Sequence, residues 1–125
     1  MPEFNFGRSL RLLDSSDFTR VFSHAELKVA CPAMLILAVH NDKPHPRLGM
    51  VVPKKQVKLA ARRNTIKRVI RESFRHRRHT LPPVDIVVIA RRDIGNLSKP
   101  ALAALLDKQW SRLERKTMNS PENRS

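Results

Sequence analysis

The sequence predicts a single α/β domain in which helices cover one β-sheet. Two observations predict this fold class. Apolar residues recur at helical spacing in two long segments, 59–77 and 98–116. Three short apolar segments, 33–40, 48–52 and 84–90, have the composition of strands. With a short helix before them, the expected element order is α-β-β-α-β-α. The expected domain covers residues 1–116, followed by a flexible polar tail, 117–125.

The N-terminal part predicts an arm followed by a short helix. Residues 1–10 carry little periodicity, so we expect them to be loosely ordered. Asp14 is a suitable N-cap residue. Phe18, Val21 and Phe22 then fall on one face of a helix.

Turn residues separate the expected strands. Pro32 precedes segment 33–40, and the connection 41–46 is rich in turn residues. The second strand, 48–52, is expected to run antiparallel to the first and to end at Pro53. Segment 84–90 is β-branched and nearly all apolar, which is typical of a buried strand.

Two long helices complete the fold. The first is expected over 59–77, and residues 81–83, Leu-Pro-Pro, would break the chain after it. In the second, Ser98 is a candidate cap and Pro100 falls in the first turn. Its core stripe is expected to consist of Leu102, Leu105, Leu106, Trp110 and Leu113.

Positive charge dominates the composition and is unevenly distributed. The chain has 25 Lys and Arg against 11 Asp and Glu, a formal net charge of +14. Residues 54–79 hold 11 of these bases and one acid, Glu72, and so account for +10 of that charge. Self-repulsion on this scale indicates a polyanionic partner, either nucleic acid or an anionic membrane.

The helix expected at 59–77 separates its apolar and basic residues. Ile66, Val69, Ile70 and Ser73 gather on one side, with Phe74 at the margin. The opposite side is cationic and almost free of acids; its residues are Asn64, Lys67, Arg68, Arg71, Arg75 and Arg78. A solvated helix usually intersperses Glu, because like charges at i,i+4 destabilise it. Binding to a membrane would require the apolar side that the core needs. Arg forks match phosphate oxygens, so the pattern favours nucleic acid over a solvated face.

Several segments, in order, resemble the bacterial ribonuclease P protein subunit. The strongest are LGMVVPKK at 48–55 and RNTIKRVIRESFR at 63–75. DFTRVF at 17–22, preceded by Arg11-Leu12, and DIVVIAR at 85–91 are similar to the family's first helix and last strand. The resemblance implies an α/β (α+β) two-layer sandwich, like the second domain of ribosomal protein S5, with a left-handed βαβ crossover. General rules of topology would predict a right-handed crossover.

The resemblance also implies a function. Such a protein is the accessory subunit of an RNA-based endonuclease. It binds a catalytic RNA, and together they remove the 5′ leader of precursor tRNA. Catalysis then belongs to the RNA and to Mg²⁺ ions that the RNA mainly binds. The expected partners are the catalytic RNA and precursor tRNA, with neither membrane nor DNA.

The resemblance also implies which residues of this chain bind RNA. The residues implied to contact the catalytic RNA are Lys54, Lys55, Arg62, Arg63, Asn64, Lys67, Arg68, Arg71 and Arg75. Phe18 and Phe22 match aromatics beside the leader-binding cleft, with core packing as the alternative. Thr65 departs from the family's usual Arg-Asn-Arg. Arg62 is a candidate substitute, although it lies about 60° around the helix from Thr65.

The residues offer little for a catalytic site within the protein. The acids are scattered singly, whereas a metal-dependent nuclease needs clustered carboxylates. His76 and His79 form one close pair, which we expect to add RNA contacts. Cys31 is the only cysteine, so no disulfide can form within the chain and a reducing compartment is expected. No signal peptide is recognisable, and we expect a soluble cytoplasmic protein without catalytic residues.

Three other functions remain open. A ribosomal or RNA-chaperone protein would use the same basic helix, but the flanking motifs argue against it. A nuclease acting without an RNA subunit would cleave RNA with Mg²⁺ alone. A helix-turn-helix DNA-binding protein would need a second helix close before the basic one, where Pro53 and a strand are expected instead.

Overall fold

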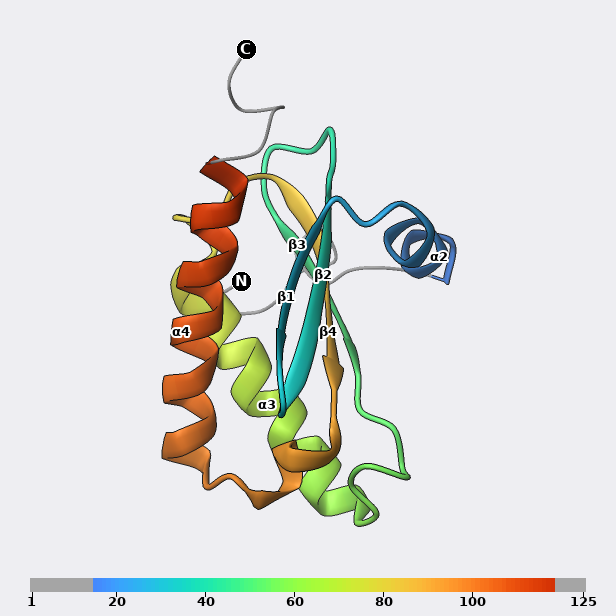
Figure 1. Cartoon of the computed structure of the whole chain (residues 1–125), viewed down its shortest axis with the longest axis vertical. Coiled ribbons are helices and arrows are strands. Elements are labelled where there is room, and N and C mark those ends of the chain that lie inside the picture. Colours follow the sequence, from blue (N-terminus) through green and yellow to red (C-terminus); the bar gives the residue numbers. More distant parts are fainter. Residues whose placement is uncertain (1–14, 119–125) are drawn as a thin grey trace, which may run out of the picture.

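The computed structural model describes residues 15–118 (Figure 1). The expected N-terminal arm and the Asp14 cap lie outside these residues. The described part begins with helix α2 (Ser15–His24) and strands β1 (Leu27–Cys31), β2 (Met34–His40) and β3 (Arg47–Val51). It continues with helix α3 (Ala60–Arg77), strand β4 (Val84–Ala90), 3₁₀ helix η1 (Arg92–Asn96) and helix α4 (Lys99–Met118).

The four strands form one mixed sheet with the order β1-β2-β4-β3. β1 with β2 and β2 with β4 are antiparallel pairs, whereas β3 and β4 are parallel. The prediction that β3 runs antiparallel to β2 is right in direction, but β4 lies between them. The parallel pair is joined through α3, which is the βαβ unit that the family resemblance implies.

Strand β1 is the element that the sequence prediction misses. It pairs with β2 through a tight turn at Pro32 and Ala33, with Cys31 opposite Met34. Only Leu27 and Val29 of its five residues are buried, and exposed residues alternate with them. So short an alternation at a sheet edge gives a weak pattern.

Helices cover both faces of the sheet, unequally (Figure 1). Helices α3 and α4 pack on one face, and α2 lies on the other. The main core lies under α3 and α4 and includes Ile66, Ile70, Phe74, Leu106, Trp110, Met34, Ile36, Ile86 and Val88. A smaller cluster of Val21, Val39 and Val87 lies under α2. The α/β sandwich is therefore confirmed, with the short helix α2 added on its second face.

Helices α3 and α4 are fixed to one another by an aromatic pair and a hydrogen bond. The Phe74 and Trp110 rings meet edge to face, with centroids 6.1 Å apart. Trp110 Nε1 donates to Ser73 Oγ at 2.7 Å. The predicted cap of α4 is confirmed, because the amide of Ala101 donates to Ser98 Oγ. α4 runs to Met118 and buries Thr117, so the helix includes the first two residues of the expected tail.

Candidate nucleic-acid interface

Helix α3 separates a dry side from a cationic side as the sequence predicts. Ile66, Ile70 and Phe74 are fully buried against the sheet and α4. Cationic and amide side chains occupy the other side. We call Asn64, Lys67, Arg68 and Arg71, with Lys54 and Lys55 just upstream, the basic face. The apolar side of α3 is therefore used by the core and is not available to insert into lipid.

The basic face carries charges that the rest of the described chain does not neutralise. Within residues 15–118, none of its side chains makes a hydrogen bond or an ion pair. The first turn of α3 holds no acidic residue. Lysines and arginines kept apart from carboxylates raise the local positive potential, which attracts a polyanion.

Arg75, which the motif also includes, is already paired. It forms an ion pair with Glu72, which also lies 3.8 Å from His76 Nε2. Glu72 thus neutralises charge near the end of α3, as its isolated position among bases indicates. Arg75 therefore contributes less unpaired charge to an anion than Arg68 or Arg71.

Arg62 and Arg63 hold the start of α3 in place. Arg63 Nη1 donates to the carbonyls of Val57, at 3.0 Å, and Lys58, at 2.9 Å. Arg62 Nη2 donates to the carbonyl of Leu97 and, at 3.3 Å, to that of Gly95. Both arginines donate hydrogen bonds to backbone carbonyls of the protein. Arg62 is therefore a poor substitute for a positive charge at position 65.

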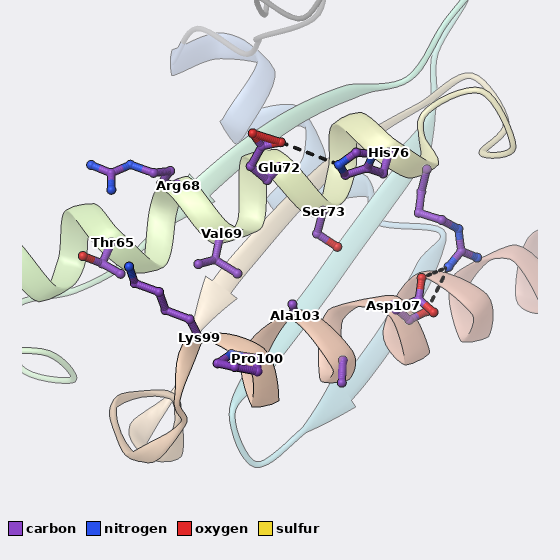
Figure 2. Close-up of a pocket in the computed structure, with 12 residues that line it drawn as sticks. Thr65, Arg68, Val69, Glu72, Ser73, His76, Lys99, Pro100, Ala103 and Asp107 are labelled. Atoms are coloured by element: carbon purple, nitrogen blue, oxygen red, sulfur yellow. Dashed lines mark hydrogen bonds and ion pairs between the residues drawn. The ribbon is translucent and has the colours of Figure 1, made fainter.

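Thr65 is also engaged within its own helix. Its hydroxyl donates to the carbonyl of Ala61 at 3.1 Å, so its proton is not free for a phosphate oxygen. The positive charge that is missing at position 65 can come instead from a residue of α4. Lys99 lines the same groove as Thr65, and Figure 2 shows its side chain extending from α4 toward Thr65. Sequence reasoning missed Lys99, because the packing of two helices brings it there.

The two aromatic residues of α2 differ in exposure. The Phe18 and Phe22 rings are stacked, with centroids 6.3 Å apart and planes 27° apart. Phe22 is 48% exposed, whereas Phe18 is half-buried against the small cluster under α2. Phe18 is therefore partly packed in the core, whereas Phe22 is not.

The sheet face beside α2 is only partly covered. Leu37, Val51 and Ile89 pack against the small cluster yet keep part of their surface exposed. Phe18 packs against the same cluster, and the Phe22 ring stacks on Phe18, so these side chains give the α2 side of the sheet an apolar surface. Such a surface can accept flat, unstacked bases.

A buried ionic network fixes α2 on this face. Asp85 of β4 is fully buried, and Arg47 of β3 pairs with both of its carboxylate oxygens. Arg20 of α2 also pairs with Asp85, and Asn41 Nδ2 donates to it at 2.8 Å. Arg47 reaches Asp17 of α2 as well, at 3.3 Å.

The network keeps its carboxylate ionised. Burial works to raise the pKa of Asp85, but hydrogen bonds from Arg47 and Asn41 and the positive charges of Arg47 and Arg20 outweigh it. The pKa of Asp85 therefore lies below its ordinary value of 3.8. The hydrogen bond to Asp85 is the main reason that the pKa of Arg47 is raised. Asp85 is thus a structural anchor rather than a free acid.

A groove runs between α3 and α4 (Figure 2). Its volume is about 650 Å³. Both apolar and charged side chains line it. The lining residues are Thr65, Arg68, Val69, Glu72, Ser73, His76, Arg77, Lys99, Pro100, Ala103, Ala104 and Asp107.

A second basic patch follows strand β4. Arg91 and Arg92 are exposed and line a small pocket together with Gln56, from the loop after Lys54 and Lys55. The sequence prediction missed this pair, although two consecutive arginines directly after a strand are a usable signal. Asp93 lines the same pocket, so the two arginines are not far from an acid there.

The described residues offer no multidentate site for a metal ion. Within residues 15–118, no group of three or more His, Cys, Asp or Glu side chains could hold one. His76 lies near Glu72, and His79 is exposed without a carboxylate partner among the described residues. In the same part of the chain, no helix is both long and apolar enough to cross a membrane.

Comparisons with known proteins agree with these features over most of the chain. The family model for ribonuclease P matches residues 6–114. The chain is 48% identical over 125 residues to a ribonuclease P protein component from Pseudomonas aeruginosa, covering 100% of this chain and 90% of that protein. It is also 48% identical over 112 residues to one from Aliivibrio fischeri, covering 90% and 95%.

A solved structure supports the same assignment. The RNase P protein of Staphylococcus aureus superposes with a TM-score of 0.73 at 27% identity, covering 88% of this chain and 96% of that one. Sequence match, fold and basic helix therefore agree, and the chain belongs to the ribonuclease P protein family.

Proposed function

We propose that this protein binds the catalytic RNA of ribonuclease P through its basic face and receives the 5′ leader of precursor tRNA beside α2. In this role it assists the endonucleolytic removal of the leader. The observation that carries the proposal is the unpaired positive charge of α3 in a chain that matches the family over residues 6–114.

The geometry of α3 favours RNA over the other polyanions. Because Ile66, Ile70 and Phe74 are buried, the helix has no second apolar face for a membrane. The element before α3 is a strand, β3, rather than a helix, so the arrangement is not a helix-turn-helix. Phosphate contacts from Lys67, Arg68 and Arg71 would supply affinity rather than sequence recognition.

The surface beside α2 suits a single-stranded leader. The exposed Phe22 ring offers a face on which a base can stack, and Leu37, Val51 and Ile89 extend the apolar surface. Stacking on an aromatic ring is worth about 1–3 kcal/mol per base and tolerates any sequence. Such tolerance suits a subunit that meets many different leaders.

We assign the chemistry of cleavage to the RNA. Asp85, the buried carboxylate, is occupied by Arg47, Arg20 and Asn41, so it is not a free metal ligand or general base. The donor set of the described residues does not fit a catalytic Mg²⁺ site, and the ions would be held by RNA phosphates. The protein would then lower the Mg²⁺ requirement by neutralising phosphates near the cleavage site. Work on precursor tRNA would place it in the cytoplasm.

Reconstitution tests this proposal. The protein is added to catalytic RNA and precursor tRNA at low Mg²⁺, and leader cleavage is followed. Stimulated cleavage supports the proposal, whereas unchanged cleavage favours a ribosomal or RNA-chaperone protein. Cleavage by the protein and Mg²⁺ without the RNA subunit would indicate a nuclease that acts alone.

A further inference from the structure

The groove between α3 and α4 adjoins the basic face and shares Arg68 with it. Thr65 and Arg68 line its α3 side, and Lys99 and Pro100 line its α4 side (Figure 2). Its volume of about 650 Å³ falls within the range of about 300–1,000 Å³ that is typical of small-molecule sites.

The floor of the groove is apolar and built from small side chains. Val69 on α3 faces Pro100 and Ala103 on α4 (Figure 2), and Ala104 also lines the groove. The three α4 residues are exposed and Val69 is half-buried, so the described part of the chain leaves this apolar floor open. Small side chains on facing helices leave a slot that is suited to a flat ring.

The charged residues around the groove are not equivalent. At one end, Asp107 pairs with Arg77 at 2.5 Å, and Glu72 pairs with Arg75, so both acids are neutralised. At the other end, Arg68 and Lys99 have no hydrogen-bond or ion-pair partner among residues 15–118. The groove therefore joins an apolar slot to an end with two uncompensated cations.

Lys99 supplies positive charge where α3 has none. Thr65 lies on the rim of the groove, and Lys99 extends toward it from α4, whereas the exposed Arg68 side chain extends from α3 away from α4 (Figure 2). The Thr65 hydroxyl donates to Ala61, so it remains an acceptor rather than a donor for an anion. An anion at this end would therefore meet Lys99 from α4, and the exposed Arg68 side chain would turn toward the groove to reach it from α3.

We propose that this groove holds one unstacked nucleotide of the RNA partner, with its phosphate between Lys99 and Arg68 and its base over Val69, Pro100 and Ala103. The proposal deepens the proposed function, because it adds a base contact to an interface otherwise made of phosphate contacts. It also makes Lys99 a direct phosphate contact in place of a cation at position 65.

Charge complementarity favours a nucleotide over a protein occupant. An apolar peptide or a second copy of this chain would leave Arg68 and Lys99 without an anion, and this chain itself carries a net charge of +14. A nucleotide combines a flat apolar face with one phosphate, which matches the slot and its cationic end.

The first test removes the cation. Lys99→Ala should weaken binding of catalytic RNA and lower the slope of log affinity against log salt by about one unit. Lys108→Ala is the matched control, because Lys108 is exposed on the same helix and does not line the groove. Equal slopes for the two variants would overturn the phosphate contact.

The second test fills the slot and leaves every charge in place. Ala103→Phe should weaken RNA binding roughly fivefold or more without changing the salt slope, because a stacked base is lost rather than an ionic contact. Ala101→Phe is the control, since Ala101 is exposed on α4 outside the groove. Thermal unfolding of both variants establishes that they fold. Equal affinity of the two variants would overturn the base contact.

A photocrosslinker identifies the occupant directly. Benzoylphenylalanine replaces Ala103, with the same substitution at Ala101 as control, and the full protein is irradiated with the catalytic RNA. A crosslink to one RNA nucleotide from position 103 alone supports the proposal. A crosslink to a second copy, to a terminal segment of the same chain, or to nothing overturns it.

The wild-type protein separates this proposal from the function on which it rests. If wild-type protein stimulates leader cleavage while the groove variants behave as their controls do, the nucleotide site is wrong and the proposed function stands. If wild-type protein neither binds the catalytic RNA nor stimulates cleavage, the proposed function itself fails.

Discussion

Arg47 donates two parallel hydrogen bonds to the buried carboxylate of Asp85, from Nε to Oδ1 at 2.8 Å and from Nη2 to Oδ2 at 2.7 Å. The pair joins the neighbouring parallel strands β3 and β4, on which the βαβ unit depends. Arg20 adds α2 to the same carboxylate. The surface that carries Phe22 is thus held to the sheet by one ionic centre.

Replacing Asp85 tests this anchor. Asp85→Asn keeps the size of the side chain but removes the counter-charge of Arg20 and leaves Arg47 only its longer pair with Asp17, at 3.3 Å. We expect it to lower the free energy of unfolding by about 3–5 kcal/mol, the usual cost of breaking a buried pair. Chemical denaturation measures the change. Asp107→Asn is the control, because that exposed ion pair with Arg77 should cost at most about 1 kcal/mol. Equal losses would contradict the anchor.

The acid dependence of stability follows from the same carboxylate. The pKa of Asp85 is lower in the folded protein than its ordinary value of 3.8, so its contribution to stability is complete above that pH. The contribution is lost as the pH falls from about 3.8 through the folded pKa. The free energy of unfolding, measured from pH 6 to pH 2, should therefore fall less steeply below pH 4 in Asp85→Asn. A slope equal to that of the wild type would rule out this linkage.

Arg68 and Arg62 should differ in what they do. Arg68→Ala should weaken binding of catalytic RNA and lower the salt slope by about one unit, because its side chain has no partner among residues 15–118. Arg62→Ala should instead lower stability by about 1.5 kcal/mol, because it loses hydrogen bonds to Gly95 and Leu97. Salt titration and thermal unfolding of both variants check this. A changed slope for Arg62→Ala alone would reverse the assignment.

Phe22 and Phe18 should separate leader binding from core packing. Phe22→Ala should weaken the binding of precursor tRNA more than that of mature tRNA. The difference should be about 1–3 kcal/mol if one base stacks on the ring. Its stability should change little, because the ring is 48% exposed. Phe18→Ala should also reduce stability, since that ring packs on the small cluster. Affinities of the reconstituted enzyme for both tRNAs give the answer, and equal weakening would remove Phe22 from the leader site.

The sequence predicted where helices and strands lie along the chain better than it predicted which strands pair in the sheet. Helix α3 begins one residue from its predicted start, and β4 has its predicted bounds, because both patterns are long or strongly apolar. Local patterns carry no information on which strands pair, so the insertion of β4 between β2 and β3 did not follow from the residues. Asp85 lay within an apolar strand, and its partners come from β3 and α2.

The candidate site was predictable where it lies on one helix. Lys67, Arg68 and Arg71 share a face because of helical spacing alone. Helix packing brings Lys99 toward Thr65, so no spacing in the sequence predicts it. Arg62 and Arg63 have the right residue type and lie in the motif, yet they bind backbone carbonyls. Residue type alone does not distinguish an anion contact from an intramolecular one.

The rate of leader cleavage at low Mg²⁺ tests the central claim most directly. Catalytic RNA and precursor tRNA are incubated with wild-type protein or with the double variant Lys67→Ala/Arg71→Ala. The double variant Arg115→Ala/Lys116→Ala, at two exposed residues of α4, is the control for the two lost charges. If the basic face binds the catalytic RNA, the wild type and the control should both stimulate cleavage. The Lys67→Ala/Arg71→Ala variant should require at least about tenfold more protein to reach the same rate. Equal stimulation by the Lys67→Ala/Arg71→Ala variant, or none by the wild type, would contradict the claim.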